Sequence, residues 1–265
     1  MNATTVPEPN AIDSGLVLPG RALPPGAGWD WIAGGWKLFV RAPVMWIAAM
    51  VLIFIAFIAI GIVPILGGIA VQLLQPVVAA GLIVASQSLE RGGNFELDHL
   101  FAGFKKNFGN LAIVGLLFML GGIVIFLIFL AIVAMTVGTA FLTGNVEQIY
   151  STIAASVLTI LFGLLVMLAL LVPLMAAYWF APALVILHDM QPMAAMRASF
   201  FACFRNFIAF IVYGFIVLVL GFIAMIPFGL GYLVLIPVVM ASVYVAYRQI
   251  FTEDTAPVVA KPTFA

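Results

Sequence analysis

The side chains that could do chemistry are few, and four of them form two adjacent pairs. His188 precedes Asp189, and Asp98 precedes His99. A histidine beside a carboxylate could act as a general base or supply ligands to a metal ion. Adjacent residues of a helix point about 100° apart, however, and two histidines without a third ligand make a poor zinc site. We therefore expect surface solvation or helix termination at both pairs, and we predict no catalytic residue, metal ion or cofactor.

Other catalytic and binding motifs are absent from the sequence. Cys203 is the only cysteine, so neither an internal disulfide nor a thiolate metal site can form. There is no glycine-rich phosphate loop, nucleophile elbow or HExxH motif. The adjacent cations Lys105 and Lys106 are too few for a nucleic-acid surface. We therefore expect a protein that is not an enzyme and that binds no nucleic acid.

Composition indicates that the membrane is the solvent of this chain. It is 66% hydrophobic and 8% charged, with a mean hydropathy of +1.29, whereas soluble proteins are roughly 25% charged. Six apolar segments predict an all-α polytopic membrane protein, with spans at 44–63, 66–89, 111–135, 151–187, 207–226 and 230–251. None has an ionisable residue at its centre, which argues against a proton-coupled antiporter, a voltage sensor or a charge-relay enzyme.

Charge predicts the orientation of the spans. All ten Lys and Arg residues lie in the N-terminal arm, the even-numbered connections or the C-terminal tail, and the connections near Pro64, Gly144 and Pro227 contain none. Because Lys and Arg concentrate in cytoplasmic loops, we expect both termini in the cytoplasm. The ten cations are Arg21, Lys37, Arg41, Arg91, Lys105, Lys106, Arg197, Arg205, Arg248 and Lys261.

The predicted domain organisation is one six-helix membrane domain over residues 29–251. Residues 1–28 are rich in proline and glycine and read as a disordered cytoplasmic arm, and residues 252–265 read as a disordered tail. Within the membrane domain we predict three parallel repeats, at about 29–90, 96–189 and 192–251. Each repeat would be a short interfacial helix followed by a transmembrane hairpin.

The repeat rests partly on a proline followed by small residues in the second helix of each hairpin. At a similar distance after each proline the chain reaches an acid, which is Glu90, Asp189 or Glu253. A proline within a span frees a backbone carbonyl and bends the helix, and small residues allow other backbones to approach. We expect the bent helices to pack at the bundle centre, with a gating role as the alternative. The motif residues are Pro76, Ala79, Ala80, Pro173, Ala176, Ala177, Pro237 and Ala241, with Ser242 after the last.

A second repeated element precedes each hairpin, where two aromatic rings three residues apart are followed by a cation. The rings are Trp36 and Phe39, Phe101 and Phe104, and Phe201 and Phe204. This spacing places both rings on one helical face, and the cations can reach lipid phosphates. We expect a preference for anionic lipid; the alternative is that these charges only set topology during insertion. The candidate headgroup residues are Lys37, Arg41, Lys105, Lys106, Arg197 and Arg205.

The middle unit is longer than the other two and more polar at its turn. Residues 151–187, as one helix, would measure about 55 Å, more than a hydrocarbon core of about 30 Å, so this unit must project outward or bend. The polar residues near its turn are Thr136, Thr139, Thr143, Asn145, Glu147 and Gln148. Elsewhere, Gln72 and Gln75 are the most polar groups within a span. We expect both side chains to lie in the bundle interior and to form interhelical hydrogen bonds. The alternative is that they contact a polar substrate.

The stretches GWDWIAGGWKLFVRAP before the first span and MAAMRASFFACFRNF before the fifth, together with the three proline motifs, carry a resemblance. From Gly26 to Thr252 the chain resembles uncharacterised bacterial six-span inner-membrane proteins. More distantly, it is similar to the membrane domain fused to some glycerophosphodiester phosphodiesterases, whose catalytic domain this sequence lacks. The resemblance implies the fold and a multi-pass location in the bacterial inner membrane.

Three functions are compatible with these patterns. The favoured one is a non-enzymatic accessory protein that organises lipids or a membrane complex, with membrane lipids and a membrane-protein partner as its ligands. The alternative is a carrier or flippase for a lipid or another apolar small molecule, supported by the bent helices and by Gln72 and Gln75. A membrane-embedded enzyme would have to use His188, Asp189 and His99.

Overall fold

The computed structural model describes residues 15–143 and 146–253, with side chains described outside 136–156. In this part of the chain, the structure is helical apart from an isolated antiparallel bridge between Leu16 and Thr252. The elements are α1 (Ala27–Arg41), α2 (Pro43–Gly61), α3 (Leu66–Glu90), η1 (Leu97–Phe101), α4 (Ala102–Lys105), α5 (Phe108–Thr143), α6 (Val146–Trp179), α7 (Ala181–His188), α8 (Pro192–Arg205), α9 (Phe207–Met225) and α10 (Tyr232–Phe251).

Six segments are long and apolar enough to cross a membrane, which confirms the all-α polytopic class. They are Pro43–Gly61, Leu66–Glu90, Phe108–Met135, Val157–His188, Phe207–Met225 and Tyr232–Phe251. Large apolar side chains cover their outer surfaces, among them Phe54, Phe126, Leu165 and Phe215. Contiguous apolar surface of this kind is rare on soluble monomers and is expected where lipid is the solvent.

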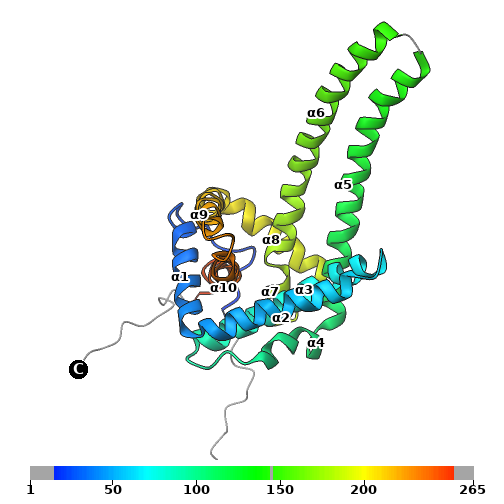
Figure 1. Cartoon of the computed structure of the whole chain (residues 1–265). Coiled ribbons are helices and arrows are strands. Elements are labelled where there is room, and N and C mark those ends of the chain that lie inside the picture. Colours follow the sequence, from blue (N-terminus) through cyan, green and yellow to red (C-terminus); the bar gives the residue numbers. More distant parts are fainter. Residues whose placement is uncertain (1–14, 144–145, 254–265) are drawn as a thin grey trace, which may run out of the picture.

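The long middle unit both projects and breaks. Figure 1 shows the α5–α6 pair rising well beyond the other helices. The helix is interrupted by a turn at Phe180 (φ −103°, ψ −5°), between the end of α6 at Trp179 and the start of α7 at Ala181. Pro182 explains the break, because it has no N–H to donate to the carbonyl four residues earlier and its ring clashes with that turn. The predicted span 151–187 is therefore two helices, and its polar turn residues lie outside the described side chains.

Short joints separate each hairpin from the helix that precedes it. Ala42 (φ −148°, ψ 56°) lies between α1 and α2, where the following Pro43 disfavours helical geometry. Asn206 (φ −108°, ψ 24°) separates α8 from α9. Before α5, Asn107 adopts a positive φ of 62°, which asparagine tolerates better than most residues. The pre-hairpin segments are thus distinct from the spans, although the middle one is only the η1 turn followed by the single turn of α4.

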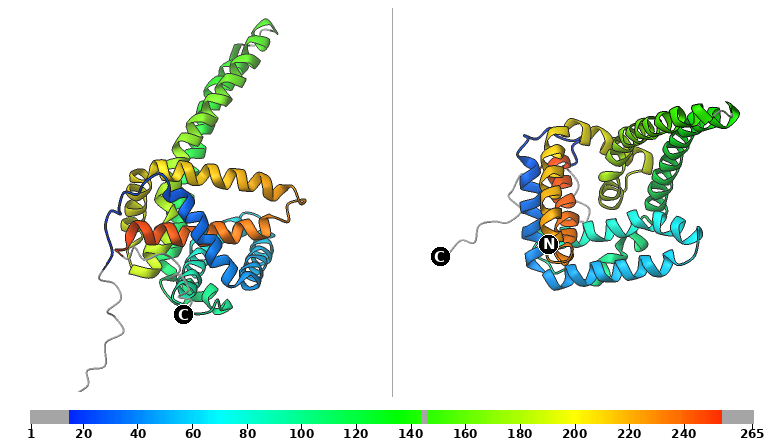
Figure 2. Two further views of the ribbon diagram at one scale, coloured as in Figure 1. Left: turned by 90° about the vertical axis from the view of Figure 1, so that its left-hand side faces the viewer. Right: turned by 45° about the horizontal axis from the view of Figure 1, so that its top comes forward.

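The three hairpins diverge. In Figure 1 the α2–α3 pair lies across the view, the α5–α6 pair rises, and α10 is seen nearly end-on. The first view of Figure 2 shows α9 and α10 extending sideways while α5 and α6 still rise. The hairpins therefore point away from a common base in three directions, and the expected gathering of all the proline-bearing helices at the centre of one bundle is only partly correct.

The common base, which we call the hub, consists of α1, η1, α4, α7, α8 and the adjoining ends of α3 and α10. Its fully buried large side chains include Trp31, Phe180, Leu184 and Phe251. α3 and α10 are the most buried of the six candidate spans, whereas little of α6 is buried. In the middle unit it is α7 that packs into the hub, where every residue from Ala181 to Ile186 is buried.

Each pre-hairpin segment packs on the proline-bearing helix of a different unit. α1 packs on α10, η1 and α4 pack on α3, and α8 packs on α6. The first unit thus contacts the third, the second contacts the first, and the third contacts the second. Three equivalent units would produce this cyclic order, and the equivalence of the units remains a prediction.

The segment before α1 is held against the end of α10. The N–H groups of Val17 and Arg21 each donate to a carbonyl of the last turn of α10, at 2.8 Å. The N–H of Leu23 donates to Asn206 Oδ1 at 2.7 Å. The disordered arm predicted over 1–28 therefore does not extend to residue 28, because backbone hydrogen bonds fix the chain from Gly15 onward.

Candidate functional site

Two glycines bring helices into contact beside the prolines of α3 and α10. Pro76 and Pro237 are buried within these helices. A Cβ atom at Gly103 would lie 2.2 Å from the carbonyl oxygen of Val77, and one at Gly35 would lie 2.4 Å from the carbonyl oxygen of Val238. Both carbonyls belong to the residue after a proline, so the backbones of α4 and α1 pack directly on the two motifs.

In the third contact a serine takes the place of the glycine. Ser199 of α8 donates from Oγ to the carbonyl of Ala176 at 2.6 Å and accepts from the N–H of Phe180 at 2.9 Å. Because Phe180 lies at the break between α6 and α7, this hydroxyl satisfies a backbone donor there. The Pro173 motif is thus bound to α8 by a buried side chain.

The small residues and glutamines of the motifs differ in burial. Ala80 and Ala241 are fully buried, whereas Ala79, Ala176, Ala177 and Pro173 are half-buried. Gln72 is half-buried, and its Nε2 atom is buried with no hydrogen-bond partner among the described residues. Gln75 is exposed, so its expected place in the bundle interior is wrong: it faces outward from α3, one turn from Gln72.

Three cations bind the carbonyl ends of helices in the hub. Arg41 donates to the carbonyl of Leu89 at the end of α3, and Lys106 donates to the carbonyl of Ile186 in α7 at 3.2 Å. Arg21 donates to the carbonyls of Gln249 and Thr252 at the end of α10. The last carbonyls of a helix lack intrahelical partners and carry partial negative charge, so these contacts stabilise the three helix ends.

The other candidate headgroup cations differ in their protein contacts. Lys105 pairs with Asp98, with Nζ 2.5 Å from Oδ1. Arg197 lies over the ring of Phe201, 5.8 Å from its centroid, and Arg205 donates to the carbonyl of Gly20 at 3.2 Å. Lys37 is exposed, and no hydrogen bond or ion pair joins it to another described residue. Of the six cations, it is the one for which no contact of these kinds with a described residue is found, and it lies at an exposed position.

The histidines and their acidic neighbours have separate structural partners. His188 Nε2 hydrogen-bonds the hydroxyl of Tyr247, whereas Asp189 accepts from Asn107 Nδ2 at 2.5 Å. That hydrogen bond, followed by the contact with Lys106, lowers the pKa of Asp189 below its usual value. His99 Nδ1 accepts from the N–H of Glu96 at 3.2 Å in a helix cap. Within the described residues, no group of three His, Cys, Asp or Glu side chains could hold a metal ion.

A largely buried ion pair joins two hairpins and was not anticipated from the sequence. Arg248 Nε of α10 lies 3.0 Å from Glu90 Oε1 at the end of α3, and both side chains are 12% exposed. The hydroxyl of Tyr244 donates to Glu90 Oε2 at 2.5 Å. The proline spacing had singled out Glu90, but no local signal identifies a partner so distant along the chain.

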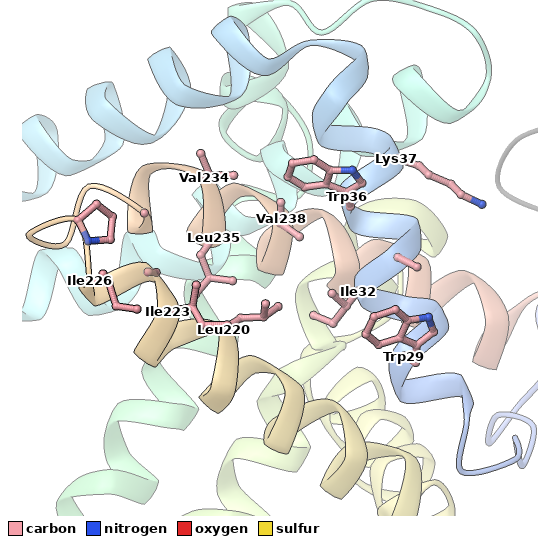
Figure 3. A pocket seen from close by; sticks show the side chains of 14 residues that line it. Trp29, Ile32, Trp36, Lys37, Leu220, Ile223, Ile226, Val234, Leu235 and Val238 are labelled. Carbon is pink, nitrogen blue, oxygen red and sulfur yellow. The ribbon is translucent and has the colours of Figure 1, made fainter.

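An apolar groove of about 740 Å³ lies between α1, α9 and α10. Figure 3 shows α1 on one side, with the rings of Trp29 and Trp36, and the side chains of α9 and α10 on the other. At the far end the groove reaches Ile226 and Pro227, beside the α9–α10 turn. Among the residues lining it, Lys37 alone carries a charge, and in Figure 3 its side chain extends away from the apolar group.

The groove could hold one long apolar chain with an anion near its α1 end. Its volume falls within the range of about 300–1,000 Å³ that is usual for small-molecule sites. Sequence analysis had selected Lys37 and Trp36 but missed Trp29 and the α9–α10 wall. The spacing of Trp29 and Trp36, two helical turns apart, was the available signal, because it places both rings on one face of α1.

Comparison with known proteins shows similarity to a distant relative. A probable inner membrane protein of Burkholderia thailandensis is 28% identical over 206 residues, which cover 71% of this chain and 70% of that protein. No family model matches the chain, and no solved structure matches it significantly. The relative and the six apolar helices together indicate that this chain is a multi-pass protein of the inner membrane.

Proposed function

We propose that this protein is a non-enzymatic accessory protein of the bacterial inner membrane, one that binds anionic phospholipid and organises lipid or a membrane complex around its hub. The groove between α1, α9 and α10 carries this proposal. Its walls are apolar, and Lys37 at its rim has no partner among the described residues. A phospholipid matches this pattern, because an acyl chain fits the walls and a phosphate fits the ammonium group.

The direction of the groove, from α1 toward the α9–α10 turn, determines the orientation of the lipid. Trp29 and Trp36 are 61% and 50% exposed on α1, and tryptophan concentrates at the membrane–water interface. The headgroup therefore lies beside α1, and the acyl chain runs toward Ile226 and Pro227. With α1 on the cytoplasmic side, as the distribution of cations predicts, the lipid belongs to the cytoplasmic leaflet.

Selectivity for the headgroup has to come from charge. The acyl chain passes from one hydrocarbon environment to another, so hydrophobic transfer contributes little to binding. One lysine near the surface contributes about 1 kcal/mol toward an anionic lipid, which corresponds to about a fivefold preference. Lys37 can bind phosphate without first breaking an ion pair with another described residue.

Native mass spectrometry of the purified protein tests the site with phosphatidylglycerol and cardiolipin. Lys37→Gln should lower retention of both by about fivefold. Lys105→Gln is the matched control, since Lys105 is paired with Asp98, and it should have a smaller effect. Equal retention by wild type and Lys37→Gln would remove the groove as a headgroup site.

A second variant tests the wider role of the cations. It changes Lys37, Arg41, Lys105, Lys106, Arg197 and Arg205 to Gln. The proposal expects it to lose most of the bound anionic lipid. If the correctly inserted variant retains as much lipid as wild type, these charges do not select anionic lipid, and only their roles in topology and in helix-end contacts remain.

A carrier or flippase for lipid remains the second candidate, because a groove open to lipid could also serve as a transport route. Reconstituted protein in proteoliposomes separates the two functions. Scrambling of fluorescent phospholipid above that of protein-free vesicles would favour the carrier, and its absence across a broad lipid panel would favour the accessory protein. The similarity to the membrane domain of glycerophosphodiester phosphodiesterases stays a prediction.

A further inference from the structure

The turns of the first and third hairpins contain no polar side chain. Every residue from Ile47 to Val71 is apolar, and so is every residue from Gly214 to Gly231. A turn that emerges into water normally carries polar residues, because loops expose their backbone to solvent. In the middle hairpin the sequence does supply them, from Thr139 to Gln148.

The apolar residues of the two turns are among the most exposed large apolar side chains of the described residues. Ile65 is 82% exposed and Ile226 is 78% exposed, and Phe228 is fully exposed. No described residue covers them. Apolar groups presented in this way require an apolar environment.

Several backbone groups of each turn are hydrogen-bonded within the turn. In the first turn the N–H of Ile62 donates to Ile58 at 3.1 Å and that of Gly67 donates to Val63 at 2.9 Å. Hydrogen bonds of the same kind run through the second turn, from Gly229 to Met225 at 3.1 Å and from Leu230 to Pro227 at 3.0 Å. Because hydrocarbon offers no hydrogen-bond partners, these internal hydrogen bonds lower the free-energy cost of placing the turns there.

Each turn contains a residue of positive φ directly after a proline. Pro64 is followed by Ile65 at a φ of 63°, and Pro227 is followed by Phe228 at a φ of 53°. Each proline also removes one N–H that would otherwise need a partner. The chain thus accepts a bulky residue in a left-handed conformation and keeps the turn short and free of polar side chains.

Helix length and direction decide how far these hairpins can reach. α2 and α9 have 19 residues each, or about 28 Å at 1.5 Å per residue, which covers a core of about 30 Å only if the helix is upright. The two hairpins diverge (Figures 1 and 2), so both cannot be upright. α5, with 36 residues, is about 54 Å long and can cross even when strongly tilted.

We propose that the α2–α3 and α9–α10 turns end within the hydrocarbon core, in contact with acyl chains, and that the α5–α6 hairpin alone crosses the membrane. The protein then remains multi-pass through α5 and α6. The two shorter hairpins enter and leave by the same face. This proposal is independent of the lipid site at Lys37.

Site-directed spin labelling in proteoliposomes tests the depth of the turns. Single cysteines replace Ile65 or Phe228 in a Cys203→Ser background. Removing Cys203, which is buried, leaves the introduced cysteine as the only thiol. Leu161→Cys, exposed on α6, is the hydrocarbon reference, and Asn145→Cys is the aqueous reference. We expect labels at 65 and 228 to resemble the label at 161, with high accessibility to oxygen and low accessibility to a water-soluble nickel complex.

Labelling of intact cells with a membrane-impermeant maleimide provides a second measurement. Positions 65 and 228 should react only after the membrane is dissolved, whereas position 145 should react in the intact cell. Labelling of 65 and 228 from the outer face at the rate of 145 would overturn the proposal. Low accessibility of both labels to oxygen as well as to nickel would also overturn it, because a protein partner, and not lipid, would then cover the turns.

Discussion

Arg248 Nε lies 3.0 Å from Glu90 Oε1 in a part of the hub where both side chains are 12% exposed. This pair joins the end of α3 to α10, so it connects two hairpins that point in different directions. Tyr244 donates to the second oxygen of the same carboxylate. Glu90 is thereby held by two residues one turn apart on a single helix face.

Removing the negative charge of this pair should destabilise the protein. Glu90→Gln removes the carboxylate that Arg248 contacts in a poorly hydrated site, and we expect a loss of up to about 3 kcal/mol in the free energy of unfolding. Thermal unfolding of the detergent-solubilised protein measures it. Lys105→Gln is the matched control, because its pair with Asp98 is exposed and such pairs contribute about 0–1 kcal/mol. Similar losses in the two variants would show that the largely buried Glu90–Arg248 pair contributes no more to stability than an exposed ion pair.

Alanine at Gly35 or Gly103 should have the opposite effect on stability to alanine at Gly214. Alanine at either position would place Cβ within 2.4 Å of a backbone oxygen, and overpacking of this kind typically costs about 1–3 kcal/mol. At Gly214, within α9, a Cβ meets nothing within 4 Å. Gly214→Ala should therefore stabilise the protein by up to about 1 kcal/mol. Thermal unfolding that showed the same sign at all three positions would contradict the close packing of α1 and α4.

Reporter fusions should place both termini on the cytoplasmic side. Alkaline phosphatase, which is active only outside the cytoplasm, should be inactive when fused after Ala265 and active when fused at Asn145. The expectation rests on ten cations on one side of the spans and none on the other. The reverse pattern of phosphatase activity would show that the membrane orientation is opposite to the predicted one.

The contact between Asn107 and Asp189 predicts a small dependence of stability on pH. The native fold lowers the pKa of Asp189, chiefly through the Asn107 hydrogen bond. The ionised carboxylate therefore adds stability above the ordinary aspartate pKa of about 3.9, and this is lost as the pH falls through the lower native pKa. Because the side chain is 62% exposed, we expect less than about 1 kcal/mol.

Asp189→Asn isolates this charge, since asparagine also tolerates the positive φ of 53° found at this position. The difference in melting temperature between wild type and the variant should be present at pH 7 and should shrink below about pH 4. A difference that did not change with pH would assign the effect to packing or hydrogen-bond geometry.

The class of fold could be read from the sequence because length and apolarity are local properties. The span predicted at 66–89 is Leu66–Glu90 in the structure, and that predicted at 207–226 is Phe207–Met225. The break at Phe180 was harder to predict from the sequence, because its cause, Pro182, lies inside a continuous apolar run. The sequence predicted a disordered arm up to residue 28, and the ordered segment after Gly15 was missed. Composition carries no information on backbone hydrogen bonds to a helix end that is distant in the sequence.

The candidate site was harder to predict than the fold. Lys37 could be selected by its type and by its neighbour Trp36, but its lack of a partner emerges only when the contacts of the other cations are known. Arg41 was selected as a lipid-facing cation, and the structure adds a protein contact at Leu89. The groove itself requires α1 to cross α9 and α10, and no pattern within α1 specifies which helices it meets.

The divergence of the hairpins has a consequence for the surrounding bilayer. A compact bundle of six helices touches lipid only around its perimeter, whereas helix pairs that spread from one base leave sectors between them. In a membrane we expect lipid to fill those sectors, where each lipid would meet protein on two sides. We expect such molecules to exchange with the rest of the bilayer more slowly than ordinary boundary lipids, so that part of the membrane environment would move with the protein.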